Sequence, residues 1–492
     1  MTPRTPRTPR TPRSKAGSSA ASRPAHRVEH DPLGPVAVPA DALYGAQTQR
    51  AAENLPISGL RATPALVRAI VQIKRAAAQT HQESERLEAR LAQAIIRAAD
   101  EVLAGRHDGE FIVDVYQAGA GTSLHMNVNE VLANRANELL GAERGVYAPV
   151  HPNDHVNMAQ STNDVIPTAI RLSALTELEP LSSALGALQA ALAERGVAFD
   201  HVVKAGRTHL QDAMPIRLGQ EFAGWAATIG RCSRRIDESA DYLRDLGIGG
   251  SAVGTGVNVD PQYPARVVGH LNAATGLDLR QGSDRIELMQ SMADIVGVSA
   301  ALRGLSIELS RIASDMRLLA SGPRTGLDEI RLPAVQPGSS IMPGKVNPSI
   351  PEMVNQVCFQ VIGNDTTVAW AAEHGQLELN VMMPVMGHNV LMSLRILANA
   401  VNAFTERCVR GITANEAQAE YWVERSAALA TALAPRLGYA RAAEIAKESV
   451  ASGESIRALV TRLGLLPPAQ IREILDLRRM TDIGVPGAAE PP

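Results

Sequence analysis

The sequence predicts a mainly α-helical protein, and two observations carry this prediction. Only 3% of the 492 residues are aromatic and alanine is common, so helix axes can approach closely and nothing indicates a core built on a sheet. Apolar residues also recur every three or four positions in two long segments, as they do along the buried face of a helix. These positions are Leu288, Met292, Ile295, Leu302, Leu305, Leu309, Ile312, Met316 and Leu319 in the first segment, and Val390, Leu394, Leu397, Val401, Phe404 and Cys408 in the second.

The first segment predicts one long helix from Leu288 to Leu319, which the sequence Ser321-Gly322-Pro323 stops. At 1.5 Å per residue this helix would span about 48 Å, which is longer than an ordinary globular helix. We therefore expect a helical bundle that extends beyond one small domain, and we interpret both apolar seams as core packing.

The N-terminus has a different composition from the rest of the chain. It repeats Thr-Pro-Arg four times, and residues 1–28 contain seven basic residues and no acidic residue. Proline at every third position prevents a helix, and there is little apolar area to bury. We predict a disordered basic tail over residues 1–30. Because the whole chain has a formal net charge of −3, its remainder is acidic, which argues against nucleic acid as a partner.

Composition also bears on compartment and on metal sites. No window approaches 18 uninterrupted apolar residues, and the chain does not open with a secretory signal. The three cysteines, Cys232, Cys358 and Cys408, are far apart and have no Cys-x-x-Cys or His-rich partner. We expect a cytoplasmic protein in a reducing compartment, with no membrane partner and no bound metal.

Three polar clusters interrupt the helical segments. The first polar cluster combines residues 119–123 with residues 151–164, the second covers residues 206–212, and the third covers residues 338–348. In the first, Ser161, Thr162 or Asn163 could cap the helix that starts near Val165. The same hydroxyl and amide groups at a helix N-terminus could equally hold a carboxylate. In the second, His209 beside Thr208 is, taken alone, more typical of a structural histidine than of a catalytic one.

The third polar cluster is a loop shaped by glycine and proline, and Glu352 follows it within the next turn. A fixed positive charge at Lys345 near a serine hydroxyl would make the alkoxide accessible. The apolar pair Ile341 and Met342 could fold over a ligand and exclude water. This chemistry suits proton abstraction from carbon, whereas the Gly-x-Ser-x-Gly pattern of serine hydrolases is absent from the sequence.

The third polar cluster reads Gly-Ser-Ser-Ile-Met-Pro-Gly-Lys-Val-Asn-Pro and resembles the signature loop of the aspartase/fumarase superfamily. Residues 160–164 and 206–210 are similar to the other two active-site segments of that superfamily, in the same order. The resemblance covers nearly the whole chain after the tail. It implies a homotetramer of three-domain subunits, in which five long helices from each chain form a twenty-helix bundle and three chains share each active site. The implied domains are an N-terminal domain over 31–161, a central bundle domain over 162–418 and a small helical C-terminal domain over 419–492.

The resemblance also implies roles for individual residues. Ser339 would be the general base that removes a proton from the carbon next to a carboxylate, while Lys345 and Asn347 would bind that carboxylate and stabilise the resulting dianion. His209 and Asn163 would lie toward the leaving group, with Glu352 orienting His209. No organic cofactor is implied. The remaining residues implied to bind a C4 dicarboxylate are Thr122, Ser161, Thr162, Asn163, Thr208 and Ser340.

Within the superfamily, several segments resemble the aspartase branch, which implies reversible deamination of L-aspartate to fumarate and ammonia. These segments are residues 51–59, 161–163, 362–367 and 375–380. Two positions depart from that branch: His125 stands where an asparagine is usual, and His374 replaces a small residue. The alternatives are hydration of fumarate to malate by the same serine and lysine, and a non-catalytic structural protein on a lyase scaffold. The structural role is disfavoured because every candidate catalytic residue is present.

Overall fold

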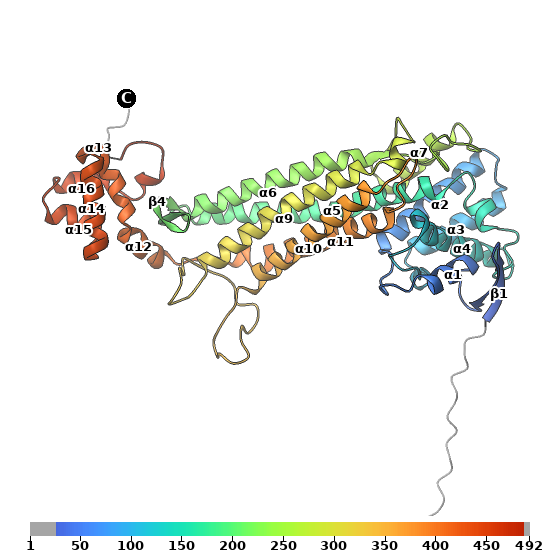
Figure 1. Cartoon of the computed structure of the whole chain (residues 1–492), viewed down its shortest axis with the longest axis horizontal. Helices are drawn as coiled ribbons and strands as arrows, with labels where there is room; N and C mark the ends of the chain where they lie inside the picture. Colours follow the sequence, from blue (N-terminus) through green and yellow to red (C-terminus); the bar gives the residue numbers. More distant parts are fainter. Residues whose placement is uncertain (1–25, 487–492) are drawn as a thin grey trace, which may run out of the picture.

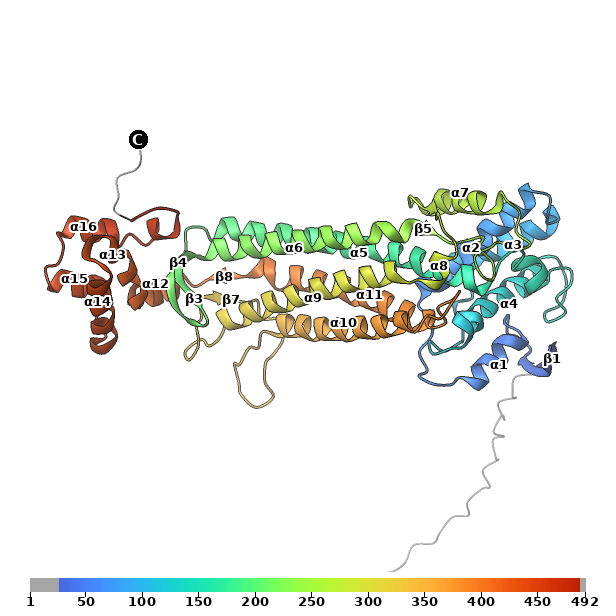
Figure 2. The ribbon, with the colours of Figure 1, turned by 45° about the horizontal axis from the view of Figure 1, so that its top comes forward.

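A computed structural model of the chain describes residues 26–486. The molecule is elongated, with a helical N-terminal part, a long helical bundle and a small helical C-terminal part arranged along its long axis (Figure 1, Figure 2). Between residues 26 and 486, none of the helices combines the length and the apolar character needed to cross a bilayer. The predicted mainly α fold is confirmed.

The predicted tail covers residues 1–30. Residues 1–25 lie outside the described residues, and residues 26–30 are folded. Strand β1 (His26–Asp31) pairs antiparallel with β2 (Gly34–Pro39). The Arg27 guanidinium holds β1 in place, because it donates hydrogen bonds of 2.8 Å to the carbonyl oxygens of Ala42 and Tyr44. The prediction of disorder was therefore wrong for residues 26–30, since composition gave no sign of this anchor.

The N-terminal part is built mainly from α1 (Ala46–Asn54), α2 (Pro64–Glu83), α3 (Ala89–Leu103) and α4 (Thr122–Leu139). Helix α2 begins where the Thr63 side chain accepts a hydrogen bond from the backbone N–H of Leu66, and Pro64 occupies the first helical position. Later in the chain, α7 (Tyr263–Thr275) packs against α2. This part of the molecule carries the first polar cluster.

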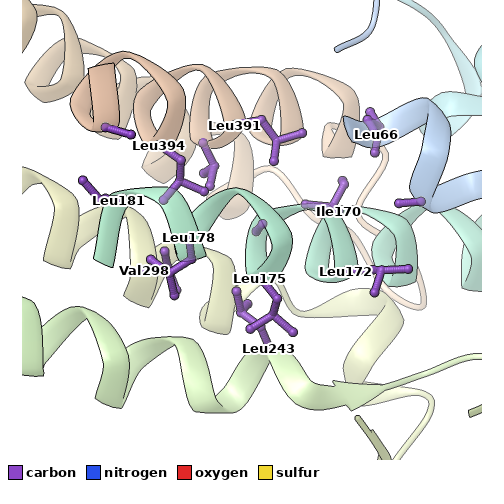
Figure 3. Close-up of a cluster of buried hydrophobic side chains, with 14 of the residues drawn as sticks. Leu66, Ile170, Leu172, Leu175, Leu178, Leu181, Leu243, Val298, Leu391 and Leu394 are labelled. Carbon is purple, nitrogen blue, oxygen red and sulfur yellow. The ribbon is translucent and has the colours of Figure 1, made fainter. Parts of the chain in front are cut away.

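Five long helices form the bundle: α5 (Thr162–Ala198), α6 (Leu218–Ala240), α9 (Ala293–Leu319), α10 (Ser349–Glu373) and α11 (Met383–Arg407). Helix α5 packs against α6 and α11, while α9 packs against α6 and α10. Leucine, isoleucine and valine side chains from these helices interdigitate in the core, as Figure 3 shows around Leu175, Leu178 and Val298. Both predicted apolar seams are buried here.

The first seam does not form a single helix. A short helix α8 (Glu287–Gln290) comes first, and the chain turns at Ser291, whose ψ of 136° is extended, before α9 starts at Ala293. Leu288 and Met292 are buried on either side of this turn, so the apolar spacing continues across it. A pattern of side-chain burial cannot distinguish a continuous helix from two helices that present the same buried face.

Short strand pairs connect the bundle to its surroundings. The hairpin of β3 (Val203–Thr208) and β4 (Gln211–Arg217) joins α5 to α6 at the far end of the bundle from α4 (Figure 1). The other pairs are parallel β5 (Asp245–Leu246) with β6 (Arg280–Gln281) and antiparallel β7 (Ile330–Arg331) with β8 (Thr413–Ala414).

The C-terminal part is a set of shorter helices with its own apolar core, which includes Leu433, Ile456 and Leu459. The predicted boundary at residue 418 falls inside the first of these helices, and the division into residues 31–161, 162–418 and 419–492 stays a prediction. The helices are α12 (Glu416–Arg425), α13 (Ala434–Leu437), α14 (Tyr439–Ser452), α15 (Ile456–Arg462) and α16 (Pro468–Ile474).

Candidate active site

The first polar cluster surrounds the N-terminus of α5. The Ser161 hydroxyl accepts a hydrogen bond of 3.2 Å from the backbone N–H of Asn163, and the Asp164 carboxylate accepts one of 2.9 Å from the backbone N–H of Ser161. This reciprocal pair caps the helix. The capping interpretation therefore holds for Ser161. The side chain of Asn163 points elsewhere, because its amide donates to the carbonyl oxygen of Ala252 at 2.7 Å.

Thr162, the first residue of α5, joins α5 to α4. Its Oγ1 lies 3.1 Å from Thr122 Oγ1 and 2.8 Å from Nδ1 of His125. Thr122 is exposed whereas Thr162 and His125 are buried. The two threonine hydroxyls that the resemblance assigns to carboxylate binding thus meet, although 40 residues separate them in the chain.

Asp164 is fully buried below this cluster and accepts backbone hydrogen bonds from Ser161, Gly249 and Ser251 at 2.9–3.0 Å. Burial raises the pKa of the Asp164 carboxyl to about 6, although the three N–H donors favour the charged form. The carboxylate ties the loop at residues 249–252 to the N-terminus of α5. These hydrogen bonds fix the position of the loop relative to the helix N-terminus.

The second polar cluster forms the tip of the β3–β4 hairpin. His209 and Leu210 are the two turn residues, with φ of 53° and 61°, and both are exposed. Two-residue turns with positive φ at both positions normally contain asparagine, aspartate or glycine. The hairpin is held from below, where Glu329 is fully buried and forms ion pairs with Lys204 at 3.2 Å and Arg207 at 2.9 Å. A histidine in a strained turn on a rigid base suggests a functional position.

The third polar cluster is a closed loop between β7 and α10. The backbone N–H of Gly338 donates to the carbonyl oxygen of Lys345 at 2.9 Å, and the Asn347 side chain donates to the carbonyl oxygen of Gly338. A Cβ atom on Gly338 would lie 2.4 Å from the Lys345 carbonyl oxygen, so the loop closes only around a glycine. The Ser339 and Lys345 side chains are therefore presented by a compact loop, although it lies at the surface.

Within this loop the Ser339 hydroxyl has an unusual environment. Its Oγ accepts hydrogen bonds from the backbone N–H groups of Ile341 at 3.2 Å and Met342 at 2.9 Å. Two fixed N–H donors stabilise negative charge on an oxygen. The side chains of Ile341 and Met342 are exposed, with 83% and 49% of their surface accessible, as expected of residues that await a ligand or a neighbouring chain.

The first polar cluster does not meet the other two within one chain. Thr162 is the first residue of α5, and the β3–β4 hairpin follows the last residue of that helix. The 37 residues of α5, at 1.5 Å each, therefore separate the first polar cluster from the hairpin by about 55 Å. The loop bearing Ser339 leaves the bundle toward the hairpin end (Figure 2). Between residues 26 and 486 no hydrogen bond or ion pair joins His209 to Glu352, and the orienting role of Glu352 stays a prediction.

Sequence reasoning missed Lys74, which lies on α2 behind the first polar cluster. Its Nζ is 2.6 Å from His125 Nε2, and the residue is fully buried. Burial lowers the pKa of Lys74 well below 10.5, and burial together with the nearby lysine lowers the pKa of His125 well below 6.5. The available signal was the position of the lysine directly after Ile73 and shortly before the alanines at 76–78. In the part of the chain that the structure describes, no group of three or more His, Cys, Asp or Glu side chains is arranged to hold a metal ion.

Comparison with known proteins gives matches over almost the whole chain. A protein-family model described as lyase matches residues 34–363, and one described as fumarase C C-terminus matches residues 429–482. The chain is 48% identical to an aspartate ammonia-lyase from a Bacillus species, over 94% of this chain and 98% of that protein. It is 49% identical to a class II fumarate hydratase from Halobacterium salinarum, again over 94% and 98%.

A solved structure agrees with these matches. The crystal structure of a fumarate lyase:delta crystallin from Brucella melitensis bound to cobalt superposes with a TM-score of 0.90. The two sequences are 48% identical, and the match covers 93% of this chain and all of that one. Names of both an ammonia-lyase and a hydratase thus occur at nearly the same identity.

Proposed function

This chain belongs to the lyase family that contains the aspartate ammonia-lyases and the class II fumarate hydratases, and we propose that its reaction is the reversible deamination of L-aspartate to fumarate and ammonia. The observation that supports an elimination most directly is the Ser339 hydroxyl, whose oxygen receives two backbone N–H bonds in a loop that also carries Lys345. Both features favour an alkoxide, which is a base strong enough for a carbon-bound proton.

In the proposed reaction, Ser339 takes the proton from C3 of aspartate. The electron pair of the broken C–H bond moves into the adjacent carboxylate, which becomes a dianion, and Lys345 and Asn347 stabilise that charge. The pair then returns to form the C2–C3 double bond while the C2–N bond breaks. Ammonia departs with the nitrogen electron pair, and no electrons are gained or lost overall.

The leaving group distinguishes the two candidate reactions. The amino group of aspartate is already an ammonium ion, so it leaves as neutral ammonia without a proton donor. A malate hydroxyl needs a proton to leave as water. We assign His209, oriented by Glu352, and Asn163 to the leaving-group side, with Thr122, Ser161, Thr162, Thr208 and Ser340 on the substrate carboxylates.

The site is complete only in an assembly. Because about 55 Å of α5 separates the first polar cluster from the second, we propose a homotetramer in which three chains each supply one cluster. The five-helix bundle of each chain supplies the surfaces for this assembly.

The choice of substrate is tested by offering L-aspartate and L-malate separately to the purified protein and following fumarate by its ultraviolet absorbance. We expect aspartate to be consumed with release of one ammonia per fumarate, and malate to be turned over at least about a hundredfold more slowly, since the malate hydroxyl is a poor leaving group without a well-placed acid to protonate it. Turnover of malate with none of aspartate would overturn the proposal.

Fumarate hydratase is the second candidate, because the relative from Halobacterium salinarum is as similar as the ammonia-lyases. The hydratase would use the same serine base and would require a proton donor near the leaving group. If the protein is a hydratase, His209→Gln would abolish hydration of fumarate. If it is an ammonia-lyase, the same variant would still deaminate aspartate at a measurable rate.

A further inference from the structure

The buried lysine of the first polar cluster has an unusual set of partners. The Lys74 Nζ contacts three uncharged acceptors, His125 Nε2 at 2.6 Å, Asn157 Oδ1 at 2.8 Å and Gln160 Oε1 at 3.0 Å. Asp164 acts on it from a longer distance. A lysine is rarely buried completely, because its charge loses hydration. A protonated amine has three N–H donors, and here each of them finds an acceptor.

The two amide partners have fixed orientations. The Asn157 amide nitrogen donates to the carbonyl oxygen of Gln160 at 3.2 Å. The Gln160 amide nitrogen donates to the carbonyl oxygens of Val156 and Met158 at 3.3 and 3.1 Å. Both amide oxygens must therefore face Lys74 and accept from it. Only the third contact of the amine, with the imidazole, can run in either direction.

That third contact sets the direction of a chain of hydrogen bonds. When Lys74 donates to His125 Nε2, the neutral imidazole carries its proton on Nδ1 and donates to Thr162 Oγ1 at 2.8 Å. This tautomer is the one that a protonated Lys74 imposes, and its three acceptors favour the protonated amine even though burial lowers its pKa. The hydroxyl of Thr162 then has its own proton to give, and Thr122, 3.1 Å away, can use its proton for the Gly119 carbonyl oxygen at 2.6 Å.

We propose that Lys74 and His125 are positioning residues that make the Thr162 hydroxyl a hydrogen-bond donor to a carboxylate of the C4 dicarboxylate substrate. A carboxylate only accepts hydrogen bonds, so a threonine serves it only while its proton points outward. This inference rests on the proposed function, since it assigns a residue set to the carboxylate side of that site.

The reverse arrangement explains why the lysine is needed. A neutral amine, or an apolar side chain at position 74, leaves His125 free to carry its proton on Nε2. The Nδ1 atom then accepts from Thr162, whose only proton turns inward. The substrate carboxylate would face the lone pairs of Thr162 and would be repelled.

The test measures the affinity of succinate, an unreactive C4 dicarboxylate, by calorimetry with the assembled full-length protein. Lys74→Met and His125→Leu should each weaken succinate binding by roughly tenfold to a hundredfold, as for the loss of one hydrogen bond to a charged group. In a Thr162→Val background, Lys74→Met should cause no further loss, because the last link is already broken. Affinities equal to wild type in both single variants, or independent losses in the double variant, would overturn the proposal.

Two further variants separate positioning from stability. His125→Gln keeps one acceptor and one donor, and should restore succinate affinity to within roughly threefold of wild type. His81→Phe removes another buried imidazole from α2, one whose Nε2 contacts the Met158 carbonyl oxygen, and should lower Tm without changing succinate affinity. If His125→Gln bound succinate as weakly as His125→Leu, the loss of affinity would not be caused by the broken chain of hydrogen-bond donors.

The two proposals fail in different ways. Wild-type protein that binds succinate but deaminates no aspartate would end the proposed function and leave this test intact. Wild-type protein that deaminates aspartate, with variants that bind succinate normally, would end this inference alone.

Discussion

Ser339 occupies a loop whose backbone is already arranged around its hydroxyl. The N–H groups of Ile341 and Met342 both point at its Oγ, at 3.2 and 2.9 Å, before any substrate is bound. Such fixed dipoles require no reorganisation when charge develops on the oxygen. The proposed role of Ser339 as the base therefore does not require a neighbouring histidine.

Replacing Ser339 by alanine should remove the base and leave the carboxylate ligands in place. We expect turnover of aspartate to fall by roughly three orders of magnitude or more while succinate binding persists. Lys345→Ala should instead weaken binding and turnover together, since its charge acts on substrate and transition state alike. Rate and affinity measurements on both variants check the contrast. Near-normal turnover in Ser339→Ala would move the role of base to His209.

Individual residues of the candidate site could be predicted from the sequence where they lie close together in one short motif. Residues 338–348 predicted a shaped loop with a base and a cation, and the loop is indeed closed by Gly338 and Asn347. Lys74 was missed because a lysine in an amphipathic helix is normally assigned to the solvent side. Its burial depends on acceptors from other elements, which no local pattern reveals.

An ion pair joins α3 to α4 where these two helices pack together. Arg135 donates from Nε to the Glu101 carboxylate at 2.6 Å and from Nη2 at 3.0 Å, and this pairing lowers the pKa of Glu101 to about 2. A carboxyl whose pKa is lower in the folded state adds stability above its unfolded pKa, near 4.5. It loses that contribution as the pH falls toward about 2.

Glu101→Gln should therefore lower the free energy of unfolding by about 1–2 kcal/mol at neutral pH, after allowance for solvent screening of a pair near the surface. The difference from wild type should shrink as the pH is lowered below about 4.5, because wild type then loses the same interaction. Thermal unfolding at a series of pH values measures this. Glu53→Gln, an exposed carboxylate that accepts from Gln49, serves as the control. A Tm difference that stayed constant down to acid pH would contradict the assignment.

At the element scale, periodicity predicted which residues are buried but not where each helix begins. The seam from Leu288 to Leu319 is buried as expected, yet the chain turns at Ser291, near the start of the seam. Likewise, composition assigned residues 26–30 to the tail, whereas the Arg27 side chain fixes them as a strand. Both differences arise from contacts with segments that are distant in the sequence, and local propensity does not predict such contacts.

For the whole molecule, the separation of the clusters predicts complementation between inactive subunits. One variant would carry Thr122→Val with Thr162→Val, and the other Ser339→Ala. When the two inactive proteins are unfolded together and refolded as a mixture, about a quarter of the sites should receive one intact first cluster and one intact third cluster from different chains. Activity of each variant refolded alone is the control. A mixture that stays inactive while forming tetramers would show that each site is built from a single chain.

The length of α5 also bears on inheritance. Because its 37 residues hold the first and second polar clusters about 55 Å apart, a chain bent in the bundle would, in the proposed tetramer, bring a misplaced segment to each of three sites. If an intact allele and an allele that encodes the bent chain were expressed equally, only about one site in eight would receive three intact chains. Such an allele would act as a dominant negative, whereas a substitution confined to Ser339 would only halve the number of working sites. A lesion that bends α5 would thus be dominant, whereas a lesion at Ser339, which lies outside this helix, would be recessive.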